Sequence, residues 1–253
     1  DRLPEASVFP EALMQKEGER VQPTPVGQRL PFRKMVVREG VLRYTDGGEV
    51  ALWGVNYYPQ SWTQYDSLKT LGIDHRRSID EDFEDFAQMG LDMIRIHVFD
   101  TEISDGEGNL IRNEHLDLLD YLVAQCDRRG ICLMLTPMAW WWSPSARPDS
   151  FSQNTPKEAM SMWEQSWDAQ RNYLRQFLTH ENPYTKRRLV DEPCLALFEV
   201  INVPTYWSYG DVTTATPGET RLSGELSTRA MDGVRAAWRA FAPDEAWQKP
   251  HVF

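Results

Sequence analysis

Apolar and polar positions along residues 51–202 switch repeatedly between two periods, and this switching predicts strands followed by helices. Short apolar runs are typical of buried strands, and they occur at residues 51–58, 91–99, 131–136 and 194–201. Between these runs, apolar residues recur every three or four positions, as they do in a helix with one buried face. The alternation predicts an α/β fold with a parallel sheet.

Residues that begin and end helices support this division. Ser78 and Glu81 have the spacing of a capping box and predict a helix that begins at Ser78 and ends at Gly90. Asn113 is expected to cap the next helix, which Gly130 ends. Each glycine is followed directly by one of the apolar runs, so helix and strand follow one another closely.

The N-terminal part of the chain has a different pattern. Residues 1–34 are rich in Pro, Glu and Arg and lack a sustained period, so we expect an extended arm or a partly disordered segment. Residues 35–50 alternate apolar and polar around Gly40 and a turn at Asp46, which predicts a short capping hairpin. The chain from residue 35 to 253 would then be one domain that begins with this hairpin.

Composition and charge argue against several classes of function. The 253 residues carry a formal net charge of -11, whereas a nucleic-acid partner favours a basic surface. No apolar run approaches the roughly 20 residues of a membrane span. The three cysteines lie in apolar patterns, so we expect small buried side chains without a disulfide or metal role.

Motifs of other enzyme chemistries do not occur in this sequence. The five histidines have neither His-x-His nor HExxH spacing, so no metal site is predicted. The sequence has no GxGxxG or phosphate-binding glycine loop and no Gly-x-Ser-x-Gly elbow. We therefore expect no cofactor.

Ten tryptophans are the strongest compositional signal. Tryptophan is ordinarily a core residue, but several here fall in predicted loops that follow strands. Flat aromatic side chains in such loops suit stacking against the apolar face of a sugar. The expected carbohydrate-binding aromatic residues are Trp62, Trp140, Trp141, Trp142, Tyr206 and Trp207.

Residues 189–209, LVDEPCLALFEVINVPTYWSY, carry a family resemblance. An apolar run ends here in Asn202-Val203-Pro204. It resembles the fourth strand of clan-A glycoside hydrolases, the superfamily of cellulases, mannanases and β-galactosidases. In that clan the strand ends in Asn-Glu-Pro, and the Glu is the catalytic acid/base. Asn202 and Pro204 match, but Val203 occupies the position of the Glu.

The segment WGVNYYPQSW at residues 53–62 also resembles this clan, in which the first barrel strand delivers polar and aromatic groups to the cleft. The resemblance implies that Asn56, Tyr57 and Trp62 line the cleft. For Tyr57 the alternative is simply the preference of aromatic residues for strands. The segment 182–202 resembles the approach to the fourth strand of the clan.

Arg95 lies inside the second predicted strand, where an unpaired charge would be costly. The clan has an arginine on this strand that holds the nucleophile carboxylate, and Arg95 matches it. The alternative is an arginine that leans out at a strand edge. His97 lies two residues further on the same face, either as a cleft residue or as a structural histidine.

The resemblance implies a retaining mechanism, in which two carboxyl groups about 5–5.5 Å apart act as nucleophile and acid/base. Asn202 would bind the sugar 2-hydroxyl. Val203 can neither donate nor accept a proton, and general acid–base catalysis contributes about 10² to 10⁴ in rate, so activity should be impaired. Glu199 lies about 13 Å from Val203 along a strand, too far to replace the acid, and is expected to be a supporting carboxylate that pairs with Arg95.

The resemblance implies a (β/α)8 TIM-type barrel, which needs eight strands and typically ~250 residues. Here four strands occupy about 200 residues, so we expect only about the first four βα units, without the strand-seven nucleophile. Three hypotheses follow: an incomplete or impaired glycosidase for β-linked polysaccharide or oligosaccharide, a non-catalytic carbohydrate-binding relative, or a half-barrel that a partner chain completes.

The first residue is Asp1 rather than Met, as after removal of a leader. We therefore expect a secreted or periplasmic protein.

Overall fold

A computed structural model describes residues 32–139, 143–153 and 164–204, together with 155, 157, 160, 232, 233, 236 and 240. The strands are β1 (Met35–Arg38), β2 (Val41–Tyr44), β3 (Gly54–Asn56), β4 (Met93–His97), β5 (Cys132–Thr136) and β6 (Leu195–Phe198). The helices are α1 (Trp62–Leu71), α2 (His75–Met89), α3 (Asp100–Ile103), α4 (Glu114–Arg129) and α6 (Glu164–Thr179), with a 3₁₀ turn at Leu189–Asp191.

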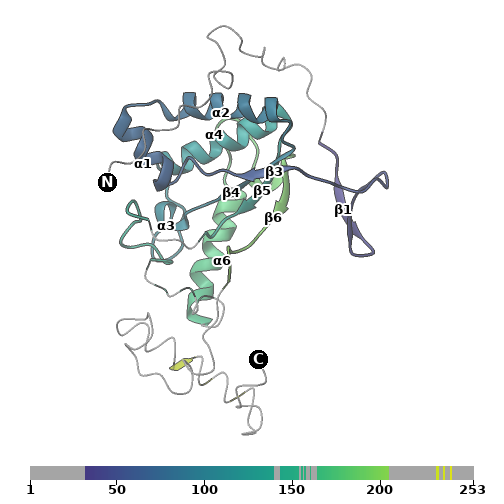
Figure 1. Ribbon diagram of the computed structural model, residues 1–253. Coiled ribbons are helices and arrows are strands. Elements are labelled where there is room, and N and C mark those ends of the chain that lie inside the picture. Colours follow the sequence, from purple (N-terminus) through teal and green to yellow (C-terminus); the bar gives the residue numbers. More distant parts are fainter. Residues whose placement is uncertain are drawn as a thin grey trace, which may run out of the picture.

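The main sheet contains β3, β4, β5 and β6 in chain order, and every neighbouring pair is parallel. Helices α1, α2 and α4 lie together on one side of these strands, and the β1–β2 hairpin projects away from them (Figure 1). Consecutive parallel strands joined by helices are the repeat of α/β proteins. The predicted α/β fold with a parallel sheet is therefore confirmed.

The core lies between the strands and the helices that cover them. On β4, Ile94 and Ile96 are fully buried, whereas Arg95 between them is only half-buried on the opposite face. Leu133 and Leu135 repeat this alternation on β5. These side chains pack with Phe83 of α2 and with α4 residues, among them Leu119, Leu122 and Val123. One face of the sheet thus holds the core, and the other carries polar side chains.

The predicted helix ends are partly right. Asn113 accepts a hydrogen bond from the Leu116 amide and caps α4, while Gly90 and Gly130 end α2 and α4 in left-handed conformations. The predicted capping box at Ser78 is wrong, because α2 begins at His75 and Asp74 accepts from the Arg77 amide. Ser78 lies one turn inside the helix, where its hydroxyl cannot cap.

Helices α1 and α3 were not predicted, and neither was the position of β6 at the edge of the described sheet. Helix α1 begins after Ser61, which makes no side-chain cap, and α3 has only four residues. The run 194–201 was expected to be a buried strand, but β6 pairs only with β5 among the described residues, and Phe198 is 40% exposed. A strand at the edge of the described sheet lacks the neighbour that would bury it.

The hairpin predicted in residues 35–50 is present as the antiparallel pair β1–β2. Of the predicted N-terminal arm, only residues 32–34 lie in the described part. The three cysteines are free, and Cys126 and Cys194 are buried as expected, while Cys132 is partly exposed. Among the described helices, none is both long and apolar enough to cross a membrane.

Candidate active site at the carboxyl ends of the strands

Arg95 of β4 joins three segments at one side of the sheet. Its Nε lies 3.2 Å from Glu199 Oε2, and its Nη2 also donates to that oxygen. Its Nη1 lies 3.3 Å from Asn56 Oδ1, and its Nη2 lies 3.3 Å from Asn202 Oδ1. The predicted ion pair of Arg95 and Glu199 is thus present, and Asn56 and Asn202 lie beside it.

The strand register explains this convergence. Asn56 is opposite Arg95 in the β3–β4 pair, so both side chains lie on one face. His97 is opposite Thr136 on the same face of the β4–β5 pair. A bulge in β6 leaves Ala196 without a partner between the pairs Leu133–Leu195 and Met134–Leu197. This extra residue moves Glu199 onto the face of Arg95.

Glu199 is held as a carboxylate. Burial alone would raise its pKa, but the Thr136 hydroxyl and the Arg95 guanidinium hold the pKa of Glu199 below its usual value. The Thr136 hydroxyl lies 2.5 Å from Glu199 Oε2. A carboxyl group with a lowered pKa gives up its proton early and cannot serve as a general acid near neutral pH. Thr136 was not predicted, although its place at the end of a parallel strand was a usable signal.

Asn202 is fixed at the end of β6. It is 2% exposed, its backbone amide donates to Met138 O at 3.0 Å, and its Nδ2 lies 3.4 Å from Ala139 O. With the amide group directed in this way, the Asn202 oxygen faces Arg95. His97 also lies close to Asn202.

His97 is 2% exposed and packs near Tyr58, with ring centroids 5.6 Å apart. Burial, and secondly the positive charge of Arg95, lower the pKa of His97 from its ordinary value. The imidazole is therefore neutral near pH 7. We call Arg95 and the residues that it contacts, Asn56, Glu199 and Asn202, the Arg95 cluster. His97 lies beside this cluster and is buried beneath the surface.

Tyr57 does not line this face, so that prediction is wrong. Its ring is 8% exposed and packs edge-on against Phe86 and Phe83, with centroids 4.9 and 6.1 Å away. Its hydroxyl donates to Asp82 Oδ2 at 2.6 Å. Because successive strand residues point to opposite faces, Tyr57 turns to the helices when Asn56 turns to Arg95.

Val203 stands at the position expected for a catalytic acid, and its backbone is unusual. Its φ is +43°, and its side chain is 63% exposed. A β-branched residue with positive φ is an outlier, and the left-handed conformation costs roughly 1–2 kcal/mol for an L-residue. The exposed side chain gains little burial in return.

Replacing Val203 with glycine is therefore expected to stabilise the fold by about 1 kcal/mol, after the entropy cost of glycine is subtracted. Urea unfolding would measure the change. Val200→Gly is the matched control, because Val200 is 51% exposed and its φ is not positive. The control should be destabilised, and equal loss of stability in both variants would contradict the argument.

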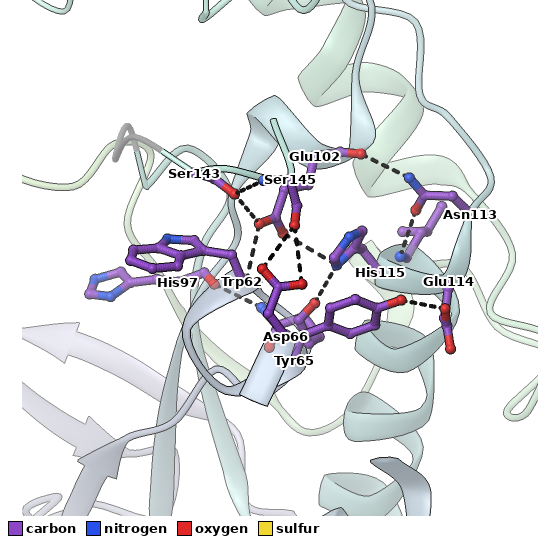
Figure 2. Close-up of polar contacts among 12 residues, drawn as sticks. Trp62, Tyr65, Asp66, His97, Glu102, Asn113, Glu114, His115, Ser143 and Ser145 are labelled. Atoms are coloured by element: carbon purple, nitrogen blue, oxygen red, sulfur yellow. Dashed lines mark hydrogen bonds and ion pairs between the residues drawn. The ribbon is translucent and has the colours of Figure 1, made fainter. Parts of the chain in front are cut away.

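Trp62 is the first residue of α1 rather than a loop residue, and it is partly buried. Its backbone amide donates to Glu102 Oε1 at 3.1 Å. Figure 2 shows this bond within a network that includes His115 and Ser143, none of which was predicted. Trp140, Trp141, Trp142, Tyr206 and Trp207 lie outside the described residues.

The sequence matches no family model and no curated protein. Solved structures do resemble it. The endo-1,4-beta-mannanase from Rhizomucor miehei is 17% identical, with a TM-score of 0.54 over 81% of this chain and 58% of that one. A glycoside hydrolase family 5 mannosidase from the same organism is 13% identical, with a TM-score of 0.52 over 80% of this chain and 54% of that one.

The chain is part of a (β/α)8 barrel. It spans about half the length of the solved structures that it matches. The similarity accords with the resemblance to clan-A glycoside hydrolases in the sequence, and the predicted fold class is confirmed. In barrels of this kind the active site lies at the carboxyl ends of the strands. In this partial barrel, Asn202 and Val203 follow β6, and Arg95, the central residue of β4, contacts Asn202.

Proposed function

We propose that this chain forms part of a retaining glycoside hydrolase of the clan-A type whose acid/base position is occupied by Val203. The observation that carries the proposal is the contact of Arg95 with Asn56, Glu199 and Asn202 on one face of the sheet. Arg95 and Asn202 each match a residue of the clan by sequence, and a hydrogen bond joins them. In this reading Arg95 orients a carboxylate, and Asn202 binds the sugar 2-hydroxyl.

The proposed substrate is a β-linked polysaccharide or oligosaccharide, and β-1,4-mannan is the first to test, because the similar solved structures include a mannanase and a mannosidase. The carboxylate of Glu199 supports the role of Arg95, since it keeps the guanidinium fixed between the strands. It does not supply the missing acid, because its pKa is lowered. A secreted or periplasmic location stays a prediction.

A non-catalytic sugar-binding protein is the second candidate. Val203 favours it, because a valine cannot transfer a proton and the neighbouring Glu199 is held ionised. In this case the Arg95 cluster and the aromatic side chains would bind sugar without cleaving it. A second chain that completes the barrel also stays a prediction.

Calorimetry with mannohexaose tests the proposed site. Asn202→Ala is expected to weaken binding about tenfold, the loss of one hydrogen bond to the ligand. Asn172→Ala is the control, because Asn172 of α6 bonds to Glu107 and Asn109 rather than to the Arg95 cluster. Equal affinities of wild type and Asn202→Ala would remove Asn202 from the site, and failure of the wild type to bind any β-linked oligosaccharide would contradict the proposed function.

A further inference from the structure

Glu102 of α3 is a carboxylate buried beside the loop that follows β3. Its side chain is 1% exposed. Its Oε1 accepts from the Trp62 amide at 3.1 Å and from the Ser143 hydroxyl at 2.6 Å. Its Oε2 lies 3.4 Å from His115 Nδ1. Donors from three separate segments therefore converge on one side chain (Figure 2).

A second set of bonds ties the same loop to the Arg95 cluster. His115 Nδ1 lies 2.7 Å from Gln60 O, so this nitrogen carries a proton and donates. The Gln60 side chain, 2% exposed, donates from Nε2 to His97 O at 2.8 Å. Residues 60–62 are thus held by β4 on one side and by α3 and α4 on the other. Figure 2 shows the Trp62 indole projecting from this network on the side of His97.

Burial of a carboxylate is costly unless its oxygens are satisfied. Burial raises the pKa of Glu102, and the hydrogen bonds and His115 oppose that rise. A buried charge of this kind adds little net stability, but it fixes the geometry of the groups that it joins. Here those groups are the start of α1, the start of α4 and Ser143, which directly follows Trp140, Trp141 and Trp142 in the sequence.

We propose that Glu102 is a positioning residue that holds Trp62 in one orientation as a sugar-stacking side chain at the edge of the Arg95 cluster. The inference rests on the proposed carbohydrate site. Glu102 acts through the backbone of Trp62 and does not touch the sugar. A tryptophan that is already ordered loses less conformational entropy when a sugar stacks on it, so Glu102 raises affinity.

The test uses protein labelled with 5-fluorotryptophan and a Trp62→Phe variant that identifies the Trp62 fluorine signal. In Glu102→Gln an NH2 group replaces one of the two acceptor oxygens. At the place of Oε2 it meets the His115 Nδ1 donor, and at the place of Oε1 it meets the Trp62 amide and the Ser143 hydroxyl, so either orientation of the new amide disturbs the network. We expect the Trp62 signal to shift and broaden, and mannohexaose affinity to fall about two- to tenfold, the effect of ordering one side chain. In a Trp62→Ala background, Glu102→Gln should leave the affinity unchanged.

Asp80→Asn is the matched control, because Asp80 of α2 accepts from the Tyr121 hydroxyl of α4 between two helices. It should leave both the Trp62 signal and the affinity unchanged. If Glu102→Gln does not fold, Ser143→Ala gives the same readout with a smaller change. An unchanged Trp62 signal in the folded variant overturns the positioning role. A changed signal in a protein whose wild type binds no sugar leaves that role intact and contradicts only the proposed function.

Discussion

Val203→Glu is expected to raise the rate of β-mannoside hydrolysis by about 10² to 10⁴, the usual contribution of a general acid–base group. Position 203 directly follows Asn202, and its exposed side chain leaves room for a longer one. The new carboxyl would stand apart from Arg95, which Glu199 already neutralises. The variant is made in the full-length gene product that contains these residues, and release of an aryl leaving group from an aryl β-mannoside is followed.

Val203→Gln is the control for this gain. It has nearly the shape of glutamate but cannot transfer a proton, so its rate should equal that of the wild type. Equal rates for the Glu and Gln variants would contradict the proposed hydrolase. Sugar binding by both variants without turnover would support the non-catalytic alternative instead.

Asp120→Asn is expected to lower the free energy of unfolding by about 3–5 kcal/mol at about pH 6, the cost of removing one partner from a buried ion pair. Asp120 Oδ1 lies 2.6 Å from His180 Nε2, and both side chains are almost fully buried. His180 Nδ1 lies 2.7 Å from Phe177 O, so both ring nitrogens face acceptors. A protonated imidazole fits this geometry, because it donates from both ring nitrogens.

The pH dependence of this loss has a definite sign. Burial alone would lower the pKa of His180, but Asp120 raises it above the ordinary value, and burial raises the pKa of Asp120 as well. The folded state therefore binds more protons than the unfolded state. The stabilisation is complete below the unfolded histidine pKa of about 6.5, and it is lost as the pH rises through the folded pKa.

Urea unfolding of wild type and Asp120→Asn at about pH 6 and about pH 9 measures the effect across the histidine pKa of about 6.5. The difference between the two proteins should be larger at the lower pH. Asp168→Asn is the control, since Asp168 pairs with Arg171 on the surface, where ion pairs contribute about 0–1 kcal/mol. A difference that stays constant with pH would show that His180 is neutral in the folded state.

The strands and helices α2 and α4 were predictable from the sequence because each carries a strong local signal. Gly90 and Gly130 adopt the left-handed conformations that end helices, and Asn113 caps as expected. Helix α1 was missed because Ser61 makes no side-chain cap and because, among the α1 side chains that the structure describes, only Tyr65 and Leu68 are buried. Ser78 misled the prediction because Asp74 offers an equally good cap one turn earlier.

The Arg95 cluster could be anticipated because its members lie in the strands or directly after them and match a known pattern. Tyr57 could not line the cleft together with Asn56, since neighbours in a strand face opposite ways. The Glu102 network had no sequence signal, because its members come from four separated segments whose contacts depend on how the loops pack. Such long-range pairings are set by tertiary structure alone.

The bulge in β6 determines toward which face of the sheet each later residue of that strand points. Ala196 is the unpaired residue, so two successive positions of this strand share one position of β5. A regular strand of the same sequence would rotate Glu199 into the helical layer and leave Arg95 facing an aromatic ring from Phe198. The acid–arginine contact in this protein thus depends on the number of residues in the strand as much as on their identity, and grafting these residues onto an ideal strand would invert their direction.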